Sequence, residues 1–238
     1  MSLAGQQVLV LGGTSGIGLA VAQAAAAQGA KLTIASSRRD SVDKALAQLP
    51  EGATGHAVDL TDGDRVRALF DEFGTLDHFV YTAGEPLLLA PLAALDVAAA
   101  RKFFEIRYFG ALTALQAAVP HLTPTGSITL TTGTAGPRPM PGSTVVSSMC
   151  GAIEALTRAL AVELAPLRVN AVMPGAVRSP LWNFPEEMRE QFFADTAAST
   201  PVQRIGEVED VARAFLYFMT QPHSTGTILT VDGGGVLS

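Results

Sequence analysis

Three glycines near the start of the chain are spaced for close contact between the backbone and a ligand. The stretch VLVLGGTSGIG leads from an apolar run into a turn containing Gly12, Gly16 and Gly18, and a helical pattern follows. Gly12 permits a tight turn, while Gly16 and Gly18 let the backbone approach a pyrophosphate at the N-terminus of the helix. A glycine-rich turn without a ligand is the alternative. Its position between a strand and a helix favours phosphate binding.

Cysteine and histidine do not occur in the spacings of metal or disulfide chemistry. Cys150 is the single cysteine, which excludes an internal disulfide and a cysteine-built metal site. The histidines are scattered, without HxH or HxxxH spacing, at His56, His78, His121 and His223. We therefore expect no metal site.

The composition of the 238-residue chain predicts a globular protein with a large core. Hydrophobic residues make up 48% and charged residues 16%, and the net charge is −6. This charge argues against a nucleic-acid partner, which would require a basic patch. No uninterrupted apolar run reaches the length of a membrane span, and the start MSLAGQQVLVLGG lacks the pattern of a secretory signal. We therefore expect a cytoplasmic protein with no membrane partner.

Short apolar runs alternate with longer helical patterns. Runs with strand length and β-branched content cover residues 7–11, 32–35, 78–82 and 127–131. Helical patterns cover residues 16–28, 41–49, 62–73, 97–121, 143–164 and 208–220, with Ser41 and Asp62 as expected N-caps and Gly29 after the first helix. This alternation predicts an α/β fold: one Rossmann-type domain over residues 1–238, with a doubly wound parallel sheet of about seven strands flanked by helices.

The segment from Pro174 to about Arg204 is predicted to be long and irregular. It carries the aromatic residues Trp182, Phe184, Phe192 and Phe193. Long connections in compact domains are often lids or binding loops, so residues 175–206 are a candidate substrate or lid segment. The alternative is that these aromatic side chains fill the core or a subunit interface.

The G-x-x-x-G-x-G spacing of the loop resembles that of the short-chain dehydrogenase/reductase family. Four further motifs are similar to that family's and occur in its order: DLTD at 59–62, RVNAVMPG at 168–175, RIG at 204–206 and VDGG at 231–234. The likeness spans nearly the entire chain. It implies hydride transfer with a nicotinamide cofactor. It also implies a homodimer or homotetramer formed through the helices at 97–121 and 143–164.

The end of the second strand favours NADPH or NADP⁺ over NADH. NAD-preferring members of the family have an acidic residue where this chain has Ser36, followed by Ser37 and Arg38. Hydroxyls and a guanidinium suit a 2′-phosphate; alternatively, Arg38 and Arg39 are solvated charges at a helix start. With the resemblance, the expected cofactor-binding residues are Gly12, Thr14, Ser15, Gly16, Ile17, Gly18, Ser36, Ser37, Arg38, Asp59, Leu60, Ala83, Gly84, Pro174, Gly175, Val177 and Ser179.

The resemblance breaks at the four positions where the family has its catalytic Asn, Ser, Tyr and Lys. Here these positions hold Arg107, Gly133, Val146 and Cys150. Val146 cannot donate a proton and Gly133 offers no side chain to an oxyanion, so the family's mechanism cannot operate unchanged. Candidate substitutes are Arg107, a permanent cation, and Tyr81, at the end of the fourth strand. Arg107 either binds an anionic group or polarises a carbonyl, or it pairs structurally with Glu105 or another acid.

Two classes of function remain open at this point. The first is an NADP(H)-dependent oxidoreductase with a noncanonical active site, acting on a small carbonyl or activated alkene. The second is a non-enzymatic NADPH-binding sensor or scaffold, or an inactive partner of an active paralogue. Cofactor binding without turnover would separate the second class from the first.

Overall fold

The computed structural model describes residues 2–238 and contains a central parallel sheet. Its seven strands are ordered β3-β2-β1-β4-β5-β6-β9, so the strand order reverses beside β1. The strands are β1 (Gln7–Leu11), β2 (Lys31–Ser36), β3 (Thr54–Ala57), β4 (Leu76–Tyr81), β5 (Leu122–Thr131), β6 (Arg168–Pro174) and β9 (Ile228–Val231). The Rossmann-type sheet predicted from the sequence is confirmed. Its point of strand reversal is where ligands bind in such folds.

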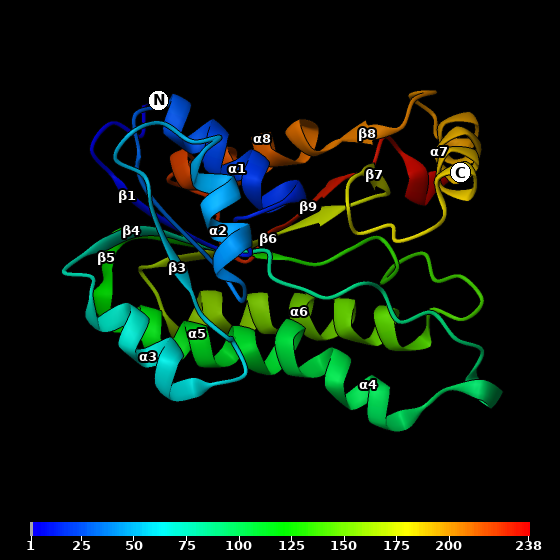
Figure 1. The fold of residues 1–238 in the computed structure, drawn as a ribbon, viewed down its shortest axis with the longest axis horizontal. Helices are drawn as coiled ribbons and strands as arrows, with labels where there is room; N and C mark the ends of the chain where they lie inside the picture. The colour runs from blue at the N-terminus through cyan, green and yellow to red at the C-terminus, as the bar shows by residue number, and fades with distance from the viewer. Residues whose placement is uncertain (1) are drawn as a thin grey trace.

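Helices cover both faces of the sheet, and each face has its own apolar core (Figure 1). One face carries α1 (Gly16–Ala27), α2 (Arg39–Leu46) and α8 (Val208–Thr220); the other carries α3 (Gly63–Asp71), α4 (Val97–Phe104), α5 (Ala111–Ala118) and α6 (Thr144–Glu163). Successive side chains of a strand point to opposite faces, so Leu9 enters one core and Val10 the other. The doubly apolar strand pattern is therefore explained by two helical layers.

Helix α6 is long and apolar enough, by length and composition alone, to cross a membrane. In the fold, however, it packs on the sheet through Val145, Met149 and Ile153, which are all buried in the core. It is therefore a core helix of the domain.

The helix predicted over residues 97–121 is interrupted. After α4 the chain forms a π-helical turn (Glu105–Gly110), continues as α5, and ends in a 3₁₀ turn (Val119–His121). Within the π turn, the Ile106 carbonyl accepts a hydrogen bond from the Tyr81 hydroxyl at 2.5 Å. This tertiary contact competes with the regular helical ladder, which accounts for a wider turn at this place.

Two of the three predicted helix-end signals are confirmed. The Asp62 carboxylate accepts hydrogen bonds from the backbone of Asp64 and Arg65, and Gly29 has a φ of +86°. Ser41 as an N-cap is wrong. Helix α2 begins at Arg39 with Arg38 as its N-cap, because β2 runs to Ser36 and the chain turns directly after it.

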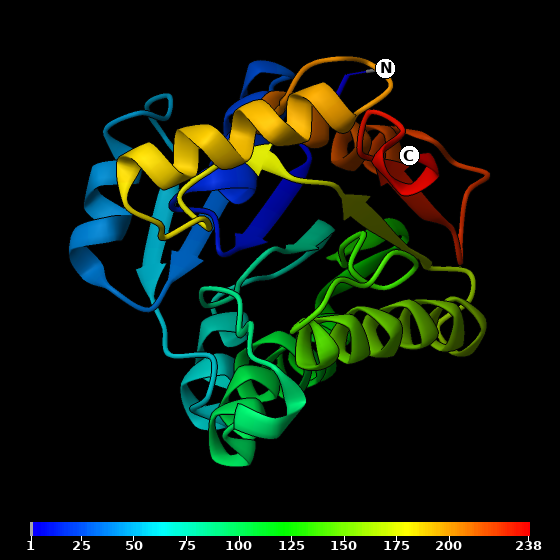
Figure 2. The ribbon, with the colours of Figure 1, turned by 90° about the vertical axis from the view of Figure 1, so that its right-hand side faces the viewer.

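The segment after β6 is more regular than predicted. It contains β7 (Val177–Arg178), the 14-residue helix α7 (Glu186–Ser199) and β8 (Gly206–Glu207), and β7 pairs with β8 in a small separate sheet. Figure 2 shows α7 as a yellow-orange helix on the side of the sheet opposite α6. The expectation of an irregular segment was wrong because α7 lacks a separated apolar face: Met188 is exposed, whereas Phe193 is buried.

Candidate cofactor and active site

A large cavity, about 1080 Å³ in volume, lies at the C-terminal edge of the central sheet. Every residue expected to contact the dinucleotide lines this cavity, apart from Arg38. The lining continues onto Arg107, Gly133, Val146 and Cys150. The fold therefore brings the glycine-rich loop and these four residues to one cavity.

The glycine-rich loop leaves room for a ligand only because these residues have no side chain. Gly12 has a φ of +87°, and a Cβ there would lie 2.5 Å from the Ala83 nitrogen. A Cβ on Gly18 would lie 2.2 Å from the Gly12 oxygen. The N-cap Ser15 forms no side-chain capping bond, so the first N–H groups of α1 stay free. This cradle fits a pyrophosphate group.

The polar residues at the end of β2 differ in whether they line the cavity. Ser36 and Ser37 line the cavity, whereas Arg38 is exposed and lies outside the lining. Arg39 forms an ion pair with Asp43 at 2.6 Å, within the first turns of α2. Arg38 as a ligand of a 2′-phosphate therefore stays a prediction that requires its side chain to turn toward the serines.

Asp59 follows β3, the strand beside β2, and its neighbour Val58 donates a backbone hydrogen bond to Ser36 at 2.8 Å. Its carboxylate accepts hydrogen bonds from the Thr61 backbone at 2.9 Å and the Thr61 hydroxyl at 2.8 Å. These bonds lower the pKa of Asp59, so it is an ionised acceptor at neutral pH.

Arg107 brings a positive charge to the cavity from the π turn. Its Nη2 donates to the backbone oxygen of Glu85, and its guanidinium carbon lies 4.8 Å from the Phe103 ring centroid. A Cβ on Gly84 would come within 2.5 Å of that carbon, so the glycine makes room for the guanidinium. The Nε atom is buried without a hydrogen-bond partner in the described chain. Burial lowers the pKa of Arg107, but a guanidinium stays charged at neutral pH.

The pairing of Arg107 with Glu105, one of the two expectations, is not formed within residues 2–238. Arg107 is held instead by a carbonyl and an aromatic ring, neither of which neutralises its charge. Its cation therefore faces the cavity without a carboxylate partner.

Tyr81 is not positioned as a substitute proton donor. Its side chain is 3% exposed, does not line the cavity, and donates its hydroxyl hydrogen to Ile106. Burial also raises the pKa of Tyr81 above its usual range. The residue belongs to the core between β4 and the π turn, because its strand position faces the same side as Phe79.

Gly133, Val146 and Cys150 form an apolar floor of the cavity. A Cβ on Gly133 would lie 3.5 Å from the Cys150 sulfur, and Val146 is 4% exposed. Burial raises the pKa of the Cys150 thiol, so it stays protonated and unreactive at neutral pH. The Thr132 hydroxyl donates to the Cys150 carbonyl at 3.2 Å and is also occupied. Arg107 is thus the strongest polar group at this end of the cavity.

The sequence predictions did not assign several loop residues that line the cavity. These are Glu85, Leu87 and Leu89 after β4, and Arg138 and Met140 after β5. Leu89 and Met140 are exposed despite being apolar. Their position just beyond two parallel strands was the available signal, since loops at that edge bind ligands.

Comparison with known proteins agrees with this architecture. The family model described as "SDR-like rossmann domain" matches residues 1–238. The chain is 36% identical to the short-chain dehydrogenase/reductase ATR9 of Stachybotrys chlorohalonatus, with 99% of each chain covered. The structure of the MalC reductase/Diels-Alderase from Malbranchea aurantiaca superposes with a TM-score of 0.92 at 33% identity, covering 99% of this chain and 98% of MalC.

A second solved structure, a small-chain dehydrogenase in complex with NADPH, is 30% identical with a TM-score of 0.84, covering 98% of this chain and all of the other. These matches extend over whole chains and agree with the glycine loop and the strand order. The chain belongs to the short-chain dehydrogenase/reductase family of NAD(P)-dependent oxidoreductases.

Proposed function

We propose that this protein is an NADPH-dependent reductase of a carbonyl or activated alkene, in which Arg107 takes over the stabilisation of negative charge. The observation that carries the proposal is the unneutralised guanidinium of Arg107 in the same cavity as the dinucleotide cradle. The NADPH complex of a related dehydrogenase supports the choice of cofactor. Ser36 and Ser37 support a preference for the phosphorylated form.

The proposed reaction requires the chain to bind the cofactor and the substrate and to stabilise a negative charge. When bound, NADPH supplies a hydride to an electron-poor carbon of the substrate. The displaced electron pair would move onto oxygen, where Arg107 would stabilise the negative charge. Val146 and Gly133 have no proton to give, so the final proton comes from solvent.

We place the protein in the cytoplasm as one domain over residues 1–238, with residues 175–206 closing over the substrate. The assembly is a homodimer or homotetramer. The cofactor is held by the glycine-rich loop and by contacts with Asp59, Ala83–Gly84, Pro174–Gly175, Val177 and Ser179. The Arg38 side chain turns toward the 2′-phosphate.

A non-enzymatic NADPH-binding sensor or scaffold, or an inactive partner of a paralogue, is the second candidate. The absence of a side-chain donor at Gly133 and Val146 favours it. The two candidates share the cofactor and differ in turnover, so binding and turnover must be measured separately.

Cofactor binding can be followed through Trp182. It is the only tryptophan in the chain and lines the same cavity, so a bound reduced nicotinamide should quench its emission. We expect NADPH to bind about tenfold or more tightly than NADH, because charged hydrogen bonds to the 2′-phosphate are lost with NADH. Equal affinities would overturn the proposed cofactor preference.

The role of Arg107 is tested by Arg107→Met, with Arg101→Met on exposed α4 as the matched control. Wild type should bind NADPH more tightly than NADP⁺, because a nearby cation disfavours the positively charged ring. Arg107→Met should narrow that difference and lower kcat by about 10²- to 10³-fold, as for other oxyanion donors. Wild-type NADPH binding with no turnover on any carbonyl or alkene would favour the sensor.

A further inference from the structure

We propose that the cavity selects a substrate with a flat aromatic ring system, held against Trp182 and Phe192. The inference deepens the proposed reductase function, because it names the substrate class of the same cavity. It depends on an aromatic wall of the cavity, which contains neither the glycine-rich loop nor the four positions Arg107, Gly133, Val146 and Cys150.

The wall consists of aromatic rings from the segment after β7 and from α7. Trp182 and Phe192 both line the cavity, with their ring centroids 4.5 Å apart and their planes inclined at 47°. Phe184 packs behind them, 6.1 Å from Trp182 and 5.9 Å from Phe192, without reaching the cavity. Trp182 and Phe192 are only half-buried, so they keep ring surface available to a ligand.

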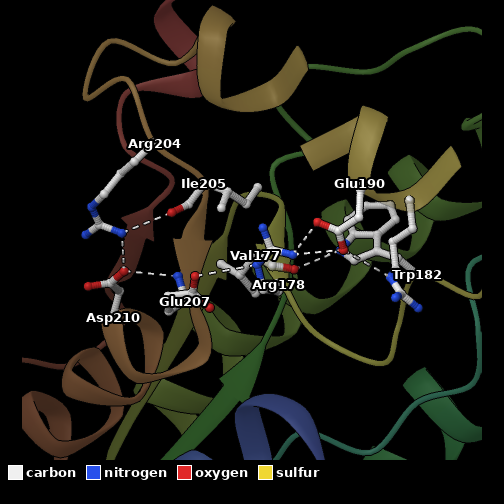
Figure 3. Close-up of polar contacts among 9 residues, drawn as sticks. Val177, Arg178, Trp182, Glu190, Arg204, Ile205, Glu207 and Asp210 are labelled. Carbon is white, nitrogen blue, oxygen red and sulfur yellow. Dashed lines mark hydrogen bonds and ion pairs between the residues drawn. The ribbon is translucent and has the colours of Figure 1, made fainter. Parts of the chain in front are cut away.

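This wall is held rigidly from behind. The Trp182 indole N–H donates to the Val177 carbonyl at 2.9 Å, and Arg178 forms an ion pair with Glu190 of α7 at 2.8 Å (Figure 3). The Arg178 guanidinium also lies 4.5 Å from the ring centroid of Phe193, which is buried. Adjacent helix positions point about 100° apart, so anchoring Phe193 directs Phe192 toward the cavity.

The loops after β4 and β5 also bring apolar side chains to the cavity, next to the charged Glu85 and Arg138. Leu87, Leu89 and Met140 line the cavity from the loops after β4 and β5. Leu89 is 43% exposed and Met140 is 56% exposed. Exposed apolar side chains at the mouth of a cavity gain from being covered by an apolar ligand, and a flexible thioether suits ring edges.

The aromatic wall carries no unpaired charge, whereas Arg107 brings a positive charge to the same cavity. The Arg178 charge is paired with Glu190 and Glu207, whereas Arg107 lines the cavity from the π turn, beside Gly84 and Glu85. A bound molecule with one polar reacting group and an apolar ring would therefore direct the polar group to Arg107 and the ring to Trp182. A small hydroxy acid would leave the aromatic wall uncovered.

The test compares two bicyclic ketones of one skeleton, β-tetralone with an aromatic ring and β-decalone without one. Binding is measured by isothermal titration calorimetry in saturating NADP⁺, which prevents turnover. We expect wild type to bind β-tetralone roughly two- to tenfold more tightly, the range typical of ring–ring contacts beyond their area. Trp182→Leu and Phe192→Leu should each remove most of that preference.

Phe184→Leu is the matched control, because its ring belongs to the same cluster but does not line the cavity. It should keep the preference. Equal binding of the two ketones by wild type, or an unchanged preference in both Trp182→Leu and Phe192→Leu, would overturn the inference. A separate titration with NADPH distinguishes the two proposals. Ring selection without NADPH binding would overturn the reductase, and NADPH binding without ring selection would overturn the aromatic wall.

Discussion

Arg107 and His78 are basic side chains placed inside the protein, and each is stabilised differently. Arg107 keeps its charge against a carbonyl and an aromatic ring at the edge of the cavity. His78, 2% exposed, places Nδ1 2.8 Å from the Ser127 hydroxyl and Nε2 3.1 Å from the Gln6 amide oxygen. Both contacts suit a neutral imidazole, because one neighbour accepts and the other can donate. Burial disfavours the charge of both groups: the guanidinium stays charged at neutral pH, whereas the imidazole is held neutral.

The free energy of unfolding should decrease as the pH is lowered, because of His78. Burial lowers its pKa from 6.5 to about 4, so the unfolded chain binds more protons between these values. The contribution of neutral His78 to the free energy of unfolding is fully present above pH 6.5. It is lost progressively toward pH 4, by up to about 3 kcal/mol. Urea unfolding across this range should show a flatter pH dependence in His78→Asn than in wild type. Parallel slopes in the two proteins would contradict this assignment.

Gly18 should be intolerant of any side chain. In Gly18→Ala the new Cβ would lie 2.2 Å from the Gly12 oxygen and 2.5 Å from the Thr82 hydroxyl, so the loop must shift. We expect the Kd for NADPH, measured by Trp182 quenching, to rise by about tenfold or more, since the N–H groups lose their alignment. Gly74→Ala, where a Cβ meets nothing within 4 Å, is the control and should bind as wild type.

Among the secondary-structure elements, those that build the site are poorly predicted from periodic apolar patterns in the sequence. The π turn places Arg107, and the small β7–β8 sheet with α7 places the aromatic wall. Both depend on contacts between distant parts of the chain, such as Tyr81 with Ile106 and Arg178 with Glu190. The central sheet, by comparison, is described well by local apolar runs.

Arg178 should control the mobility of α7. In Arg178→Gln the ion pairs to Glu190 and Glu207 and the contact with Phe193 are lost together. We expect backbone amides of α7 to exchange hydrogen several-fold faster, because local opening becomes easier. Arg189→Gln, which loses only a 3.7 Å pair with Glu190, should exchange nearly as wild type. Equal exchange in both variants would show that other contacts anchor the helix.

On the scale of the whole molecule, apolar side chains remain exposed on the helices proposed to mediate assembly. Val97 on α4, Phe109 on the π turn and Val162 on α6 are 58%, 50% and 80% exposed. Such residues gain free energy when a second subunit covers them. The π turn thus contributes Arg107 to the cavity and Phe109 to the outer surface of one protomer.

Analytical ultracentrifugation should give a mass of two or four times 24.7 kDa for the wild type. Phe109→Glu and Val162→Glu should shift the protein toward the single-chain mass, because a charge would be buried at the interface. Met188→Glu, 62% exposed on α7, is the control and should leave the mass unchanged. A wild-type protein at 24.7 kDa would contradict this assembly.

The amino-acid sequence by itself determined the type of fold and the location of the cofactor loop. The apolar runs of β1, β2, β4 and β5 and the Asp62 and Gly29 helix ends were predictable, because they depend on residues a few positions apart. The motifs also predicted which residues meet around one cavity, with Arg38 as the exception. Local chemistry was sufficient for each of these.

Only the tertiary structure decided which side chains reach the reacting end of the cavity. The Tyr81 hydroxyl donates to the carbonyl of Ile106, 25 positions away. Arg107 donates to the carbonyl of Glu85, 22 positions away. The position of α7 likewise depends on its contacts with Arg178 of β7, which its own sequence does not reveal. Side-chain orientation is set by packing between segments distant in sequence, which short-range propensities do not encode.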